Sequence, residues 1–72
     1  MKVDKLIKKY LGNVDLSFYE EKKLIASTST RDIYSGYPLD LNNWILLNSK
    51  VKSYRVVKVA DKIVFQINIE KP

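Results

Sequence analysis

The chain has 72 residues, of which 46% are hydrophobic and 29% are charged, and it contains no cysteine and no histidine. This length and composition are typical of one small globular domain, and we expect a single domain over residues 1–72. Disulfides are excluded, and the usual nitrogen and sulfur ligands of a structural metal ion are missing. We therefore expect neither a metal nor another cofactor.

The net charge of +5 is unevenly distributed along the chain. Residues 1–12 and 50–62 carry net charges of +3 and +4, whereas residues 13–49 carry −2. Two basic segments favour an anionic partner, either a nucleic acid or an acidic protein surface. The alternative is that the charge serves solubility alone, as in many small domains.

No apolar run approaches the roughly 18 residues that span a bilayer. Charged residues also interrupt the apolar residues of the N-terminal segment, which therefore lacks the hydrophobic region of a signal peptide. These observations predict a soluble, cytoplasmic protein with no membrane partner.

Residues 2–11 predict a short amphipathic helix, because apolar residues recur there at helical spacing. These apolar residues are Val3, Leu6, Ile7, Tyr10 and Leu11. Residues 14–19 alternate between apolar and polar side chains, and residues 24–30 include β-branched threonines. The two segments predict a hairpin.

Residues 27–40, STSTRDIYSGYPLD, show no clean helical or strand period. Gly36 and Pro38 interrupt regular structure, and Asp40 is suited to cap a helix over residues 41–48. In that helix we expect Leu41, Trp44 and Ile45 to share one face, and Trp44 to pack in the core.

Residues 51–59 and 63–70 predict an antiparallel hairpin, and the last segment alternates most clearly. Its residues Ile63, Phe65, Ile67 and Ile69 share one face. The whole pattern predicts an α+β fold, with a four-stranded antiparallel sheet and two short helices on one face. The expected order of elements is α-β-β-α-β-β.

The residue types argue against an enzyme. Without histidine and cysteine, acid–base catalysis would depend on Asp, Glu, Lys or Tyr, and the eight acidic residues are scattered along the chain. Two glycines are too few for a glycine-rich phosphate loop. We expect no catalytic residues.

Two groups of residues are candidates for binding instead. The first is Arg31, Tyr34 and Tyr37, because arginine and tyrosine often anchor protein interfaces. The alternative for Tyr34 is that it closes the core together with Ile33.

The second group lies on the strand that begins the last hairpin and comprises Lys50, Lys52, Tyr54 and Lys58. If the odd positions pack on the helices, Lys52, Tyr54 and Lys58 line the open face of the sheet beside Gln66 and Asn68. There they would contact phosphates and stack on a base, or contact an acidic protein surface. The alternatives are an ordinary solvated strand face and a β-bulge that exchanges the two faces.

The segments MKVDKLIKKY, VDLSFY, IYSGYPLDL, LLNSKVKSYRVV and IVFQINI resemble small accessory proteins of phages and mobile elements of Gram-positive bacteria. The stretch STSTRD is longer than the tight turn expected of such proteins. The resemblance implies an interaction protein, since some small phage proteins block host defence machinery, including CRISPR effectors.

The leading hypothesis is therefore a non-enzymatic phage or mobile-element protein that binds a host protein or ribonucleoprotein. It would act as an inhibitor of host defence, such as an anti-CRISPR. The alternative is a small basic protein that binds nucleic acid through the open sheet face. We expect a monomer or a homodimer, since an exposed edge strand and a small core both favour self-association.

Overall fold

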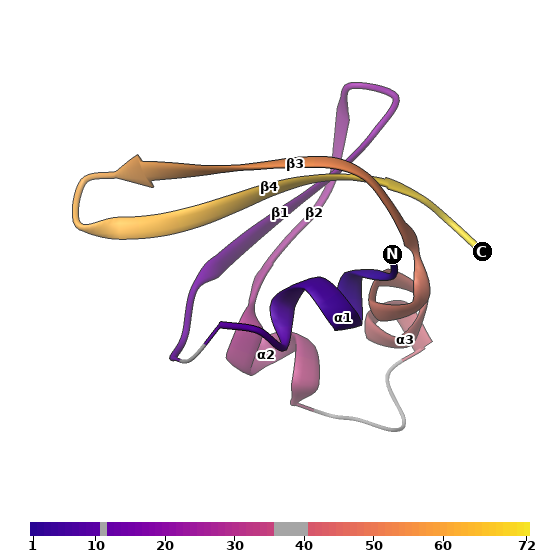
Figure 1. The fold of residues 1–72 in the computed structure, drawn as a ribbon, viewed down its shortest axis with the longest axis horizontal. Coiled ribbons are helices and arrows are strands. Elements are labelled where there is room, and N and C mark those ends of the chain that lie inside the picture. The colour runs from indigo at the N-terminus through magenta and orange to yellow at the C-terminus, as the bar shows by residue number, and fades with distance from the viewer. Residues whose placement is uncertain (11, 36–40) are drawn as a thin grey trace.

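The chain folds into two layers, a sheet and a layer of helices (Figure 1). The computed structural model describes residues 1–10, 12–35 and 41–72. The strands are β1 (Asp15–Glu20), β2 (Lys23–Ser29), β3 (Lys50–Val59) and β4 (Lys62–Glu70). The helices α1 (Val3–Ile7), α2 (Thr30–Tyr34) and α3 (Leu41–Asn48) all cover the same face of the sheet (Figure 1). The α+β class is confirmed, whereas the prediction of two helices missed α2.

The sheet is mixed, with the strand order β2-β1-β4-β3. Both hairpins are antiparallel as predicted, but the central strands β1 and β4 are parallel, so the prediction of an antiparallel sheet is wrong. The reason is the long connection through α2 and α3, which returns the chain across the helical face before β3 begins. As a result β3 runs in the same direction as β2, and β4 runs in the same direction as β1.

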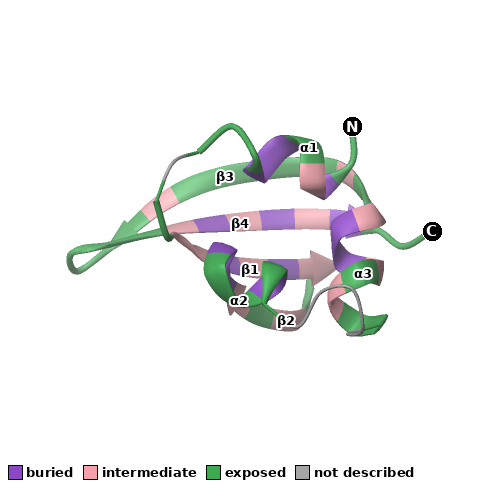
Figure 2. Cartoon of the chain, turned by 90° about the horizontal axis from the view of Figure 1, so that it is seen from below, coloured by how far each residue is buried: buried purple, intermediate pink, exposed green. Residues whose placement is uncertain are grey.

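The core lies between the two layers. Buried residues alternate with less buried ones along β1 and β4, as an element with one covered face requires (Figure 2). The buried apolar residues are Val3, Leu6, Ile7, Leu16, Phe18, Ile33, Leu46, Leu47, Phe65, Ile67 and Ile69. All three helices and both central strands therefore contribute to one core.

The structure corrects the predicted face of α3. Leu46 and Leu47 are buried, whereas Leu41 is 67% exposed and Trp44 is 46% exposed. The prediction that Trp44 packs in the core is therefore wrong. The physical reason is the shortness of the helix, because only its last turn is buried beneath the sheet.

The first helix is shorter than predicted. It ends at Ile7, and Tyr10 lies beyond it, with its ring packed edge-on against Phe65 at 4.5 Å between centroids. Gly12 adopts a positive φ of 89°, a conformation that glycine tolerates best, and the chain turns there towards β1. Leu11 of the predicted helix and the predicted cap Asp40 lie outside the described residues.

Candidate functional site

The helix α2 carries two of the three residues predicted to bind a partner. Arg31 is exposed and Tyr34 is 37% exposed, whereas Ile33 between them is buried. The alternative in which Tyr34 fills the core is therefore wrong, although Ile33 does fill it. Tyr37, the third predicted residue, lies outside the described residues.

The start of α2 has a capping signal that helical periodicity does not reveal. The hydroxyl of Ser29 accepts a hydrogen bond of 3.1 Å from the backbone N–H of Asp32, as an N-cap residue does. The residues Ser29 to Asp32 form the pattern S-x-x-D, which marks helix starts. A five-residue helix has too few positions for a clear apolar period, so this cap was its main signal.

A partly buried polar junction fixes α2 to the start of β1. The hydroxyl of Thr30 accepts a hydrogen bond of 3.0 Å from the backbone N–H of Val14 and lies 3.2 Å from Asn13 Oδ1. Asn13 Oδ1 also accepts a hydrogen bond of 3.0 Å from the backbone N–H of Arg31. The backbone of Arg31 is therefore anchored, while its side chain is exposed to solvent.

Tyr34 connects α2 to α1 through a hydrogen bond. Its hydroxyl donates to Asp4 Oδ1 at 2.5 Å, and the other carboxylate oxygen of Asp4 lies 3.1 Å from the ammonium nitrogen of Lys8. These three side chains hold the outer surfaces of the two helices together. The bond also fixes the direction of the Tyr34 ring.

The hydrogen bond shifts the pKa values of Tyr34 and Asp4 in opposite directions. Burial raises the pKa of the Tyr34 phenol, and the hydrogen bond to the Asp4 carboxylate raises it further. Burial also acts to raise the pKa of Asp4, but the hydrogen bonds from Tyr34 and Lys8 outweigh it. Together these hydrogen bonds hold the pKa of the Asp4 carboxyl below its usual value.

Replacing Tyr34 by phenylalanine should lower the free energy of unfolding by about 1 kcal/mol at pH 7, since the bond is charge-assisted but part-exposed. The depressed pKa of Asp4 means that its contribution is present at neutral pH and disappears as the pH falls through that pKa. The raised pKa of Tyr34 means that its contribution is complete below pH ~10 and declines at higher pH. Urea unfolding of both proteins from pH 3 to pH 11 measures the difference.

Tyr10 offers a matched control for this prediction. It is similarly exposed, at 40%, and its hydroxyl has no hydrogen-bond partner within the described part of the chain. Tyr10→Phe should therefore leave the free energy of unfolding and its pH dependence unchanged. Equal losses in the two variants would show that the Tyr34 hydroxyl does not stabilise the fold.

Tyr34 lines two open hollows. One, of about 730 Å³, is lined by Tyr10, Arg31 and Tyr34 among others. The second, of about 500 Å³, is lined by Tyr34, Trp44 and Leu47 together with polar residues of α1 and α3. We call the surface formed by Tyr10, Arg31, Tyr34 and Trp44 the Tyr34 surface. The structure thus brings two predicted residues together with two aromatic residues that the sequence analysis had assigned to the core side of helices.

The helical layer around the Tyr34 surface is basic. Residues 1–10 and 30–35 carry five lysine or arginine residues and two aspartates, and α3 carries no charged residue. Within the described residues, Lys8 with Asp4 is the one ion pair present. The surface is therefore complementary to an acidic partner.

The second predicted group lies on β3, where a bulge changes the expected geometry. The pairing of β3 with β4 shifts between Val51 and Ser53, so Lys52 is the extra residue of the bulge. Beyond it, Tyr54 pairs with Ile67, which faces the helices. Tyr54 and Lys58 therefore lie on the helix side, and their expected position on the open face is wrong.

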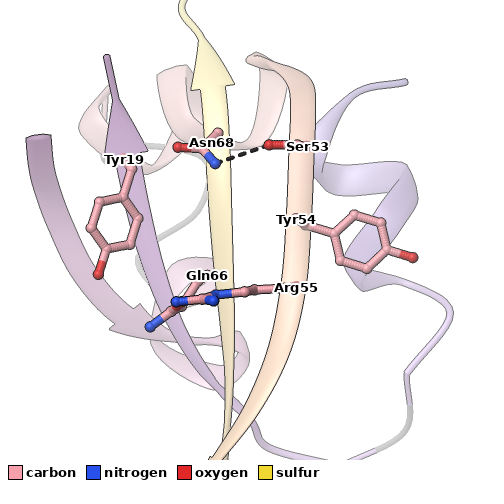
Figure 3. Close-up of a pocket in the computed structure, with 6 residues that line it drawn as sticks. All are labelled: Tyr19, Ser53, Tyr54, Arg55, Gln66 and Asn68. Atoms are coloured by element: carbon pink, nitrogen blue, oxygen red, sulfur yellow. Dashed lines mark hydrogen bonds between the residues drawn. The ribbon is translucent and has the colours of Figure 1, made fainter. Parts of the chain in front are cut away.

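The open face carries a different set of polar side chains. Arg55 Nε donates a hydrogen bond of 2.6 Å to Gln66 Oε1, and the Asn68 amide donates one of 2.9 Å to Ser53. Together with Tyr19 they surround a shallow hollow of about 320 Å³ (Figure 3). Figure 3 shows Tyr54 directed beyond the sheet edge, away from these side chains. Gln66 and Asn68 lie on the open face, as predicted. Arg55 and Ser53 lie there too, because the bulge moves the later side chains of β3 to the face opposite to the predicted one.

Neither a metal cluster nor a membrane-spanning helix occurs in the part of the chain that the structure describes. No three acidic side chains in residues 1–10, 12–35 and 41–72 come together in a way that could hold a metal ion. The helices described are also too short to cross a bilayer. The surfaces above remain the candidates for function.

Comparison with protein-family models, with curated proteins and with solved structures finds no match for this chain. A function must therefore be argued from its own residues.

Proposed function

We propose that this chain is a non-enzymatic binding protein that uses the Tyr34 surface to dock on an acidic surface of a host protein or ribonucleoprotein. The observation that carries the proposal is the exposure of Tyr34 and Trp44 around hollows next to an exposed arginine. The resemblance to small phage and mobile-element proteins extends the proposal to inhibition of a host defence system, such as a CRISPR effector.

The types of residue on this surface support the proposal. Trp, Tyr and Arg are enriched among the anchor residues of protein interfaces, whose truncation costs about 2 kcal/mol or more. Trp44 is 46% exposed and Tyr10 is 40% exposed, so large aromatic area remains in contact with water in the free protein. Burying that area against a partner would be favourable.

The anchoring of the surface also supports a binding role. The Tyr34 ring is held by Asp4, and the backbone of Arg31 is held by Asn13. A side chain that is ordered before binding loses less conformational entropy when the complex forms. The Tyr34 surface is therefore partly organised in the free protein.

The alternative proposal, nucleic-acid binding through the open sheet face, has a specific observation in its favour. Arg55 and Tyr19 lie on that face with two amide side chains, a set that suits phosphate contact and base stacking. Its weakness is charge, since only one of the six residues lining the hollow is a cation. We therefore favour the protein-binding proposal.

The test compares two double variants that remove the same chemistry from opposite sides of the molecule. Arg31→Ala with Trp44→Ala removes a cation and an aromatic ring from the Tyr34 surface. Arg55→Ala with Tyr19→Ala removes a cation and an aromatic ring from the open sheet face. Proteins and nucleic acids captured from lysate of the source cells by each variant are identified, and the affinity for the purified partner is measured.

We expect the wild type and the open-face variant to bind one protein or ribonucleoprotein with similar affinity. The Arg31/Trp44 variant should bind it at least tenfold more weakly, with an unchanged thermal midpoint because both side chains are exposed. Binding of bulk DNA or RNA with a steep salt dependence, lost only in the open-face variant, would instead establish the alternative.

A further inference from the structure

The strand β3 lies at an edge of the sheet and has a long unpaired side. It contains ten residues and pairs with β4 on its inner side alone. The end of the β3–β4 hairpin also reaches beyond the helices (Figure 1). The backbone N–H and C=O groups on the outer side of such a strand can pair with another extended chain.

The N-terminal residues show that this edge accepts a paired segment. The backbone N–H of Val51 donates a hydrogen bond of 2.8 Å to the carbonyl of Met1, and Lys2 forms an antiparallel bridge with Lys50. This pairing covers only the first two residues of β3. From Ser53 to Val59 no segment among the described residues covers the outer edge.

The charge of β3 determines what kind of segment can occupy the rest of the edge. The strand contains four cations, Lys50, Lys52, Arg55 and Lys58, and no acidic residue. None of the four takes part in an ion pair within the described part of the chain. Antiparallel pairing with a second copy of β3 would place these cations close to one another, which disfavours self-association.

An acidic strand fits the same edge. Its carboxylates would lie near the β3 cations, and its backbone would complete the hydrogen bonds. Apolar side chains of the added strand would contact Tyr54, which is 43% exposed, and Val56, which is 50% exposed. The other edge strand, β2, carries a single cation and offers no such charge.

We propose that the outer edge of β3, from Ser53 to Val59, binds an extended acidic segment of a partner protein as a fifth strand. This site is distinct from the Tyr34 surface, and the two proposals use different residues. Either one can therefore fail while the other stands.

The test uses a synthetic peptide of about eight residues, a usual strand length, in which glutamate alternates with valine. Three measurements are made. The first is the affinity of this peptide by fluorescence anisotropy, the second is amide hydrogen exchange of the protein with and without the peptide, and the third is the affinity of a second peptide of the same sequence. In the second peptide, every backbone nitrogen is methylated, so that neither edge can donate hydrogen bonds while the charge of the peptide is unchanged.

We expect the acidic peptide to bind and to slow exchange of amides between Ser53 and Val59 at least tenfold. The methylated peptide should bind at least tenfold more weakly. A variant with Arg55→Glu should also bind at least tenfold more weakly, because Arg55 lies on the face opposite to Tyr54 and Val56, where the glutamates of the peptide would lie. The matched control, Lys22→Glu, makes the same charge change at the turn of the other hairpin and should bind as the wild type does.

Three results would overturn the proposal. Equal binding of both peptides would mean that charge alone attracts them. Protection of β2 in place of β3 would place the added strand at the other edge. Displacement of the peptide by single-stranded DNA of equal charge, with the same residues affected, would make the β3 cations a nucleic-acid site.

Discussion

Replacement of Ile67 by alanine should lower the free energy of unfolding by about 2–5 kcal/mol. Ile67 is fully buried at the centre of β4, which is itself one of the two central strands. Truncation leaves a cavity that neighbours on both layers cannot easily fill, and it removes apolar area from the core. Small domains have only about 5–15 kcal/mol of stability in total, so this loss is a large fraction. Urea denaturation followed by circular dichroism measures it.

Ile63 provides a matched control on the same strand and the same face. It is 48% exposed because the end of the β3–β4 hairpin extends beyond the helices. Ile63→Ala should therefore cost less than about 1 kcal/mol, as exposed truncations usually do. Equal losses of stability in the two variants would contradict a structure in which the helices cover Ile67 and leave Ile63 exposed.

Replacement of Thr30 by valine should cost about 1–3 kcal/mol, although the two side chains have nearly the same shape. The Thr30 hydroxyl accepts the hydrogen bond from the backbone N–H of Val14, and Thr30 is only 8% exposed. Valine would leave that N–H without its side-chain partner at a largely buried junction. Thermal unfolding and hydrogen exchange of the Val14 amide measure the effect.

Thr28 is the control for this change. It lies on β2, two residues earlier, and its hydroxyl makes no hydrogen bond within the described residues. Thr28→Val should be neutral or slightly stabilising, since valine favours strands. A loss in the Thr28 variant as large as that in the Thr30 variant would assign the cost to the methyl group and not to the lost hydroxyl.

The candidate site was predictable only in part. Arg31 and Tyr34 were chosen for their residue types, and the structure places both on one exposed surface. Trp44 was missed because an aromatic residue in an apolar stretch is more often buried than exposed. The exposure of Trp44 depends on which turn of α3 packs against the sheet. A helix of eight residues is too short for its apolar periodicity to show which turn is buried.

The open face of the sheet was missed for a different reason. A single extra residue at Lys52 moves every later side chain of β3 to the opposite face. The pattern of apolar and polar residues along β3 cannot locate a bulge, because both faces of the strand carry apolar as well as polar side chains. Arg55 and Tyr54 therefore exchange places relative to the expectation.

The sequence by itself determined the four strands, two of the helices and the core residues of β1 and β4. These features depend on local periodicity, which a strand or helix needs in order to bury one face. Tertiary structure alone decided that β1 and β4 are parallel, that β3 is bulged, and that Tyr34 and Trp44 lie together. The physical reason is that alternation is the same for parallel and antiparallel partners, whereas strand direction follows from the path of the connection through α2 and α3.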